Sequence, residues 1–386
     1  MRVLLAGSVF RPEWTGGEPW VARTVANGLT ARGLDVTTHP GFHDFASITA
    51  LAASPRDWDP VRVARYRRLI ESSSPEVVLG FYDYDSSLCR ASTEAGVPYV
   101  AVVHIHWPIC PIGTRYIDGV GVCDAAGLTK CLRHMSSGVP DARLPLGLPR
   151  LPAPLGLPVY LKFGDRPRAL RDASAIIVLS QNMARHMADS GFGRLRVVPN
   201  GVDLSELRAG PWPGAPIRTL FLPSTSQSER KGTSDFRKIA GRLRARRSDV
   251  RFLATNLASD SVVEGTGLLS RSELLAQYAA SYAIVVPVLW EEPFGLVALE
   301  AMASGRPVIA YDSGAVPEIV ENEVTGLIVA RGDVAALERA AVRLLDDESL
   351  ARRLGAAGRA RAESMFGVPR MVERYLEVIR SVATTG

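Results

Sequence analysis

Short apolar segments recur along the chain and alternate with stretches of helical periodicity. Several of the segments are apolar at every position, which is typical of strands buried on both faces of a parallel sheet. The strand candidates are residues 3–6, 77–81, 99–105, 175–179, 196–198, 219–222, 251–254, 283–286, 307–310 and 326–329. The helical patterns between them cover residues 20–31, 61–70, 181–188, 272–278, 296–303 and 334–345. Strands alternating with helices predict an α/β protein with doubly wound sheets.

The strand series runs twice, which predicts two domains. A loop rich in proline and glycine at 210–216 separates the two halves and interrupts any regular element. We therefore place one domain at residues 1–205 and a second at 206–366, followed by a segment at 367–386 that carries an amphipathic helix. Before the helical pattern at 272–278, Ser270 and Glu273 have the spacing of a capping box.

The composition favours a folded globular protein, and solvated helix faces are the first explanation of its many arginines. Apolar residues make up 47% of the chain and charged residues 22%, which is ordinary for a globular protein. No apolar run approaches the ~20 residues that span a membrane, and the apolar N-terminal stretch is too short for a signal peptide, so we expect a cytoplasmic protein. The net charge of +5 permits attraction to phosphorylated donors or to an anionic membrane surface. Nucleic acid is disfavoured because no stripe of stacking aromatics accompanies the arginines.

The segment from Glu292 to Glu300 carries the strongest candidate chemistry. It joins the strand candidate 283–286 to the helix candidate 296–303, at the strand end where α/β sheets bind ligands. Gly295 lets a ligand approach the backbone, and the first N–H groups of the helix point outward at an anion. Two carboxylates beside such a helix start suit a ligand that has both phosphates and hydroxyls, as a nucleotide diphosphate sugar has.

Two glutamates separated by seven residues form the motif of retaining glycosyltransferases, and the chain resembles glycosyltransferase family 4. Other blocks of that family follow in order along nearly the whole chain: Thr15–Glu18, Val197–Asp203, Gly305–Ala310, Gly314–Val320 and Thr325–Val329. The resemblance implies the GT-B fold, in which two Rossmann-like domains face each other across a cleft. It also implies acceptor binding in the first domain, donor binding in the second, and a last helix that crosses back to the first.

The resemblance also implies roles for individual residues. Glu292 would contact the donor sugar, and Glu300 would hold the ribose hydroxyls; for Glu300 the alternative is a charge on a solvated helix face. The donor site would also include Pro293, Phe294, Gly295 and Leu296, with Gly16 and Gly17 in the turn after the first strand. Such enzymes usually need no metal or other cofactor, so side chains must neutralise the leaving diphosphate.

The residues expected to bind the diphosphate match the family pattern except at one position. Lys231 matches a phosphate-binding lysine, but Ser226 stands where an arginine is expected five residues earlier. Arg230 is the candidate to replace that arginine, since guanidinium groups bind phosphate well. The alternative for Arg230 and Lys231 is a solvated loop.

A histidine at the end of the strand candidate 99–105 is expected to reach the donor sugar. His104 aligns with the family's histidine, whereas His106 lies beyond the motif position. The alternative for His104 is a buried structural role. Three thiols and an imidazole nearby offer a second, weaker hypothesis, a structural zinc site of Cys110, Cys123, Cys131 and His134.

The sequence therefore predicts a retaining hexosyltransferase. The donor would be a UDP-sugar first and a GDP-sugar second, and the acceptor a hydroxyl of a saccharide or small polar natural product. A nicotinamide-dependent oxidoreductase is disfavoured because residues 7–12 lack the Gly-x-Gly-x-x-Gly pattern. A glycoside phosphorylase of the same fold and a non-catalytic partner subunit stay open as alternatives.

Overall fold

The computed structural model describes the chain except for residues 14–15, 43–57, 82–85, 111–112, 118–120, 124–128, 132–169, 209, 214–215, 225–227 and 385–386. The chain divides into two compact units. Unit 1 comprises Met1–Ile117, Cys123–Pro199 and Pro369–Gly386, and unit 2 comprises Asp118–Val122 and Asn200–Val368. The domain limits placed from the sequence, after residues 205 and 366, lie a few residues from these divisions.

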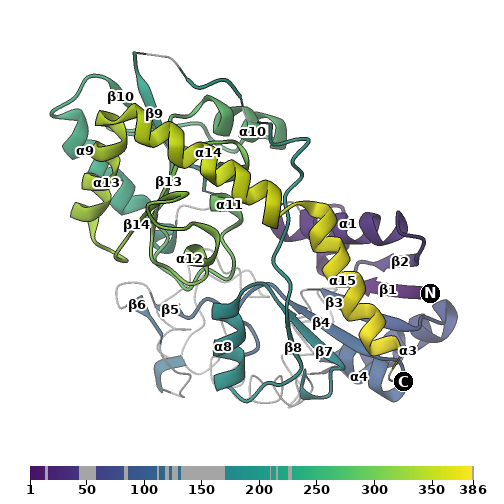
Figure 1. Cartoon of the computed structure of the whole chain (residues 1–386). Coiled ribbons are helices and arrows are strands. Elements are labelled where there is room, and N and C mark those ends of the chain that lie inside the picture. The colour runs from purple at the N-terminus through teal and green to yellow at the C-terminus, as the bar shows by residue number, and fades with distance from the viewer. Residues whose placement is uncertain are drawn as a thin grey trace. The chain divides into compact units, whose positions relative to one another are not determined.

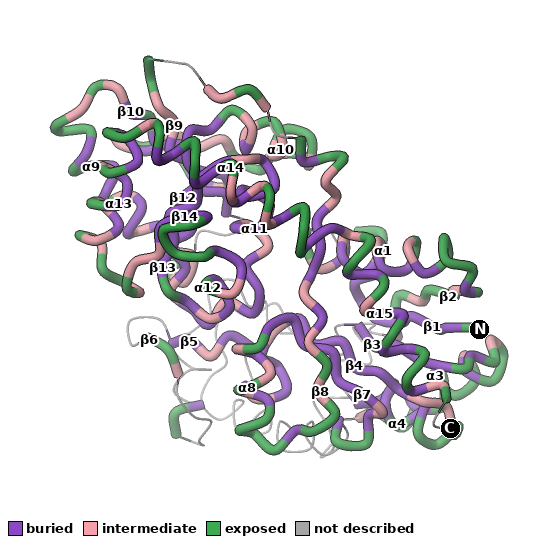
Figure 2. Tube along the Cα trace, in the orientation of Figure 1, coloured by how far each residue is buried: buried purple, intermediate pink, exposed green. Residues whose placement is uncertain are grey.

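Unit 1 is built on a six-stranded parallel sheet in the order β2-β1-β3-β4-β7-β8 (Figure 1). Its strands are β1 (Arg2–Ala6), β2 (Asp35–His39), β3 (Val77–Phe81), β4 (Tyr99–Val103), β7 (Ala175–Val178) and β8 (Leu195–Val197). The helices between them include α1 (Gly17–Thr30), α3 (Pro60–Ser73), α4 (Ser87–Glu94) and α8 (Gln181–Asp189). Every residue of β3, β4 and β7 is buried, as their uninterrupted apolar sequences predict (Figure 2). A two-stranded sheet of β5 (Tyr116–Ile117) and β6 (Gly121–Val122) is separate from it.

The edge strand β2 was not predicted from the sequence. Its sequence, Asp-Val-Thr-Thr-His, contains no apolar run, and none of its five residues is buried. It pairs in parallel with β1, from Arg2 opposite Asp35 to Ala6 opposite His39. An edge strand that is exposed lacks the hydrophobic signal on which the prediction depended.

The terminal helix α15 (Val368–Ala383) packs on unit 1, to which residues from Pro369 onward belong. Val372 lies against α1 at Gly28, where an added Cβ would come within 2.5 Å of a Val372 methyl group. Arg32, two residues after the end of α1, forms an ion pair with Glu373 at 3.4 Å. The ring of Tyr375 stacks on Phe81 with centroids 6.2 Å apart. The absence of a side chain at Gly28 thus allows the close contact between α15 and α1.

Unit 2 contains a second six-stranded parallel sheet, in the order β11-β10-β9-β12-β13-β14. The strands are β9 (Arg218–Leu222), β10 (Val250–Ala254), β11 (Glu264–Gly265), β12 (Ala283–Val286), β13 (Val308–Tyr311) and β14 (Gly326–Val329). The helices are α9 (Thr233–Arg244), α10 (Arg271–Ala280), α11 (Leu296–Ala303), α12 (Val316–Ile319), α13 (Val334–Asp346) and α14 (Glu348–Met365), with the short 3-10 helix η2 (Glu229–Lys231). The capping box of Ser270 and Glu273 is confirmed at the start of α10. The two sheets together confirm the predicted α/β, doubly wound fold class.

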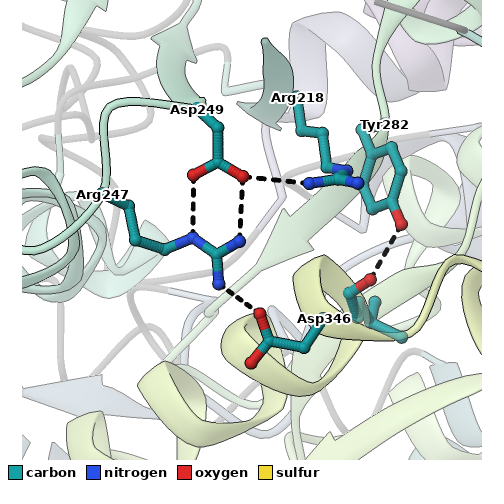
Figure 3. Close-up of polar contacts among 6 residues, drawn as sticks. Arg218, Arg247, Asp249, Tyr282 and Asp346 are labelled. Carbon is teal, nitrogen blue, oxygen red and sulfur yellow. Dashed lines mark hydrogen bonds and ion pairs between the residues drawn. The ribbon is translucent and has the colours of Figure 1, made fainter. Parts of the chain in front are cut away.

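An ion cluster ties together the amino-terminal edge of the unit 2 sheet (Figure 3). Asp249, immediately before β10, accepts two hydrogen bonds from Arg247 at 2.8 and 2.9 Å and one from Arg218 at 2.9 Å. Arg247 also pairs with Asp346 at the end of α13. Nearby, the Tyr282 hydroxyl donates to the backbone oxygen of Leu344 at 2.8 Å. This cluster is at the opposite end of the strands from their carboxyl ends, so we interpret it as structural.

The ion cluster predicts a pH-dependent contribution to stability. The hydrogen bonds from Arg247 lower the pKa of Asp249 from 3.8 to about 2. A lowered pKa means that the stabilisation is complete above pH 3.8 and is lost as the pH falls toward 2. Asp249→Asn is expected to cost about 1 kcal/mol at pH 7, because screening reduces the effect of a side chain that is one third exposed.

Urea unfolding of the wild type and of Asp249→Asn at pH 6.5 and pH 3 measures this difference. The difference between the urea midpoints of the two proteins should be smaller at pH 3 than at pH 6.5. Asp312→Asn removes the same charge at an exposed position of unit 2 outside the cluster. Its urea midpoint should equal that of the wild type at both pH values. A gap of the same size at both pH values would contradict the prediction.

Candidate functional site

The candidate site lies where the strand order of unit 2 reverses. From β9 the chain proceeds outward through β10 to β11, whereas β12, on the other side of β9, is followed by β13 and β14. The carboxyl ends of β9 and β12 are therefore neighbours at a topological switch point, the position where open α/β sheets bind ligands. The segment after β9 leads to Lys231 and the segment after β12 leads to Glu292.

A close backbone contact holds these two segments together. Gly232, directly after Lys231, has φ 73°, and a Cβ at this position would lie 1.8 Å from the carbonyl oxygen of Pro287. The amide of Leu289 donates to the carbonyl oxygen of Arg230 at 2.7 Å. Only glycine permits both this left-handed conformation and this approach. This contact brings the segment that carries Lys231 close to the segment that carries Glu292.

Lys231, Trp290 and Glu292 form a polar group at this position. Glu292 Oε2 accepts a hydrogen bond from the indole Nε1 of Trp290 at 2.7 Å and one from Lys231 Nζ at 3.4 Å. The side chains of Lys231 and Glu292 are only 21% and 15% exposed, so the pair is more than a solvated surface contact. The cationic groups of Lys231 and Arg230 lie 4.8 and 5.3 Å from the centre of the Trp290 ring. The alternative of a solvated loop is therefore wrong for Lys231.

The helix α11 begins directly after the glutamate loop. Gly295 caps it with φ 103°, a conformation that favours glycine, and the first backbone bond of the helix runs from the Leu299 amide to the Gly295 carbonyl. The three amides before Leu299 have no carbonyl to bond within the helix, and they are oriented outward from its start. Phe294 is buried, with its ring 6.2 Å from that of Phe366, and Pro293 is also buried. Leu296 is partly exposed in the first turn.

Glu300 is held by two side chains of α10. It is 6% exposed, so the alternative of a solvated charge is wrong. Glu300 Oε1 pairs with Arg271, and Oε2 accepts a hydrogen bond from the hydroxyl of Tyr278 at 3.0 Å. Burial, and then the charge of Glu300, raise the pKa of Tyr278, which keeps its hydroxyl protonated as a donor. Arg271 and Tyr278 were not predicted as site residues, because nothing in a single sequence pairs them with a glutamate on a later helix.

His104 lies in unit 1, directly after β4. The strand ends at Val103, two residues before the predicted end, so both His104 and His106 follow the strand. The rings nonetheless have different neighbours: His104 lies 6.0 Å from Phe81, and His106 lies 5.9 Å from His186. Burial lowers the pKa of His104 to about 4, so its imidazole is neutral at pH 7. Neither of its ring nitrogens has a hydrogen-bond partner within the described part of the chain.

The remaining predicted residues are placed as follows. Gly16, with φ 112°, caps α1, and Gly17 is the first residue of that helix in unit 1. Ser226, where an arginine was expected, lies outside the described residues. His134 of the zinc hypothesis also lies outside them. The three cysteines of that hypothesis are described, and no three metal-binding side chains come together among the residues that the structure describes.

Comparison with known proteins agrees with this architecture. A model of family 4 glycosyltransferases matches residues 15–206, and a model of group 1 glycosyl transferases matches residues 238–361. Glycogen synthase of Mycobacterium tuberculosis is 31% identical over 223 residues, which is 51% of each chain. An MMP α-(1→4)-mannosyltransferase of Mycolicibacterium hassiacum is 35% identical over 189 residues, 45% of each chain. The chain thus spans about half the length of the curated relatives it matches.

Solved structures show the same fold at low sequence identity. Sucrose-phosphate synthase from Thermosynechococcus elongatus superposes with a TM-score of 0.71 at 18% identity, over 100% of both chains. Anabaena HepE, solved in complex with UDP, gives a TM-score of 0.69 at 18% identity, over 99% of this chain and 100% of that one. The two doubly wound parallel sheets and the similarity to these solved structures show that the chain has the GT-B fold of glycosyltransferases. The chain belongs to glycosyltransferase family 4. Of the helices that the structure describes, none has both the length and the apolar composition to cross a membrane.

Proposed function

We propose that this protein is a retaining glycosyltransferase that transfers a hexosyl group from a nucleotide diphosphate sugar to a hydroxyl group. The observation that carries the proposal is the ion pair of Lys231 and Glu292 at the switch point of unit 2. Such a pair would supply a cation for a diphosphate beside a carboxylate for a sugar hydroxyl. The donor would be a UDP-sugar first and a GDP-sugar second, and the acceptor a saccharide or small polar natural product.

The donor would occupy the carboxyl edge of the unit 2 sheet. Lys231 and Arg230 would bind the diphosphate, together with the outward amides at the start of α11. Glu292 would accept hydrogen bonds from the donor sugar. Glu300, oriented by Arg271 and Tyr278, has lone pairs left for the ribose hydroxyls, because a carboxylate offers about four acceptor positions and described residues use two of them. His104 belongs to unit 1, and its contribution to the donor sugar rests on the family resemblance.

The chemical step would follow from this arrangement of charge. The bond between the anomeric carbon and the phosphate oxygen breaks, its electron pair goes to that oxygen, and the sugar becomes oxocarbenium-like. Lys231, Arg230 and the α11 amides stabilise the negative charge that develops on the diphosphate. The acceptor hydroxyl attacks from the face that the diphosphate leaves, and its proton passes to the departing phosphate. The anomeric configuration is thereby retained.

A panel of nucleotide sugars tests the proposed function. The protein is incubated with UDP-glucose, UDP-galactose, UDP-N-acetylglucosamine, GDP-mannose and GDP-glucose, and the release of nucleotide and the transfer of sugar are followed by mass spectrometry. We expect turnover of at least one UDP- or GDP-sugar, with no requirement for inorganic phosphate. Turnover that depends on phosphate would instead indicate a glycoside phosphorylase. Failure to bind any of the nucleotides would contradict the proposal and favour a non-catalytic subunit.

Removal of divalent metal should leave the activity intact. The proposed site neutralises the diphosphate with the side chains of Arg230 and Lys231 and with the α11 amides, so the leaving group does not depend on a metal ion. We expect initial rates in EDTA to stay within about twofold of those with added Mg²⁺, since no charge-stabilising partner is lost. Loss of activity in EDTA that Mg²⁺ or Mn²⁺ restores would contradict this part of the proposal.

A further inference from the structure

The two carboxylate oxygens of Glu292 have different environments. Oε2 accepts both hydrogen bonds, from Trp290 and from Lys231, and the shorter of them comes from the indole. Within the described part of the chain, Oε1 accepts no hydrogen bond. One oxygen is therefore held by the protein, while the other keeps its acceptor capacity for a ligand.

Trp290 also contacts the cations of the site through its ring. It is 7% exposed, so the ring is fixed by its surroundings, and Lys231 Nζ lies 4.8 Å from its centre. The guanidinium carbon of Arg230 lies 5.3 Å from the same ring. The face of an indole attracts cations, and the attraction is larger where water is excluded. A single buried side chain therefore contacts the carboxylate by its edge and both cations by its face.

We propose that Trp290 is a positioning residue that orients Glu292 toward the donor sugar. This inference rests on the proposed function, because it specifies how the carboxylate of that site is aimed. The hydrogen bond from Nε1 fixes the carboxylate plane and turns Oε1 toward a sugar hydroxyl. The ring holds Lys231 and Arg230 beside each other, where the diphosphate would lie. Trp290 itself would touch neither the sugar nor the reacting atoms.

Replacement by phenylalanine separates the two contacts of Trp290. Trp290→Phe removes the indole N–H but keeps an aromatic face for the cations. Because the lost bond is made to a charged group, we expect kcat for sugar transfer to fall by about 10- to 100-fold. The affinity for UDP should stay within about threefold, since the cation contacts persist. Trp290→Leu removes both contacts, and its affinity for UDP should be about 3- to 10-fold lower than that of Trp290→Phe.

The matched control is Trp212→Phe in the same unit. The indole nitrogen of Trp212 is buried and has no hydrogen-bond partner among the residues that the structure describes, and Arg306 and Arg352 lie over its ring. It thus resembles Trp290 in its cation contacts but lacks the bond to a carboxylate. We expect Trp212→Phe to leave both kcat and UDP affinity close to those of the wild type. The donor for these assays is the best substrate of the panel, with GDP in place of UDP if that donor is a GDP-sugar.

The indole signal of Trp290 tests the contact without any activity. The chain has six tryptophans, and the signal that disappears in Trp290→Phe identifies Trp290 among the indole resonances of a ¹⁵N-labelled protein. Glu292→Gln should move this signal upfield, because a neutral amide oxygen is a weaker acceptor than a carboxylate. An unchanged signal would overturn the inference even if the enzyme is active. A wild-type rate in Trp290→Phe, or equal losses of kcat and UDP affinity together with a lower melting temperature, would overturn it as well. If no donor is turned over, the proposed function fails, while the indole signal still decides whether the contact exists.

Discussion

Glu292→Gln is expected to lower kcat/KM for sugar transfer by about 100- to 1000-fold, the range typical for the loss of one aligned electrostatic contact in an active site. Glutamine keeps the size of the side chain and an oxygen that accepts from Trp290, so the fold of the loop should persist. It removes the negative charge that faces Lys231 and the oxygen that is left for the sugar. Initial rates with the best donor, measured by mass spectrometry, check the expectation.

Glu338→Gln is the matched control for this prediction. Glu338 lies on α13 of the same unit, its side chain is 14% exposed against 15% for Glu292, and it too pairs with cations, Arg242 at 3.1 Å and Arg246 at 3.3 Å. We expect this variant to transfer sugar at close to the wild-type rate. A Glu292→Gln variant as active as the wild type would show that the site is wrongly placed. Equal losses in both variants would point to a general loss of structure.

Lys231→Met is expected to produce a loss of similar size by a different route. The ammonium group would bind the diphosphate in both the ground state and the transition state, so its removal should weaken nucleotide binding as well as lower kcat. We expect a fall in kcat/KM of about 100-fold or more. UDP should bind the variant more weakly by about tenfold, whereas uridine should bind equally well, because a hydrogen bond to a charged group is lost only with the diphosphate.

Lys238→Met provides the comparison for Lys231. Lys238 lies on α9 in the same unit, pairs with Asp235 at 2.8 Å, and has a side chain that is 54% exposed. Because the Lys238 ammonium group is largely solvated, its loss is expected to change neither binding nor rate measurably. Calorimetric titration with UDP and with uridine distinguishes the outcomes. If Lys231→Met weakens both ligands equally, Lys231 does not contact the diphosphate.

The sequence predicted the buried part of the fold well. Strands β3, β12 and β14 and the helix α11 begin and end where their apolar patterns do. Burial on both faces leaves an uninterrupted apolar run, and turns interrupt it sharply. The exposed edge strand β2 and the short strand β11 lack that signal. The helices α9 and α14 were missed as well, although their buried residues recur on one face.

The sequence by itself determined which segments carry the candidate chemistry. The spacing of Glu292 and Glu300, the glycine before α11, and Lys231 before Gly232 are local features, and local features can be read in one chain. The family and the two doubly wound sheets followed from the order of such blocks.

Only the tertiary structure decided what these residues contact. The switch point between β9 and β12 brings Lys231 to Glu292 across 61 positions of sequence. The fold brings side chains of α10 to Glu300 on α11 and so gives it the partners Arg271 and Tyr278, which are 29 and 22 positions earlier. Trp290 is only two residues from Glu292, yet the side-chain directions that join them depend on how the loop is folded. Contacts between distant segments depend on strand order and packing, and a single sequence does not record either of them.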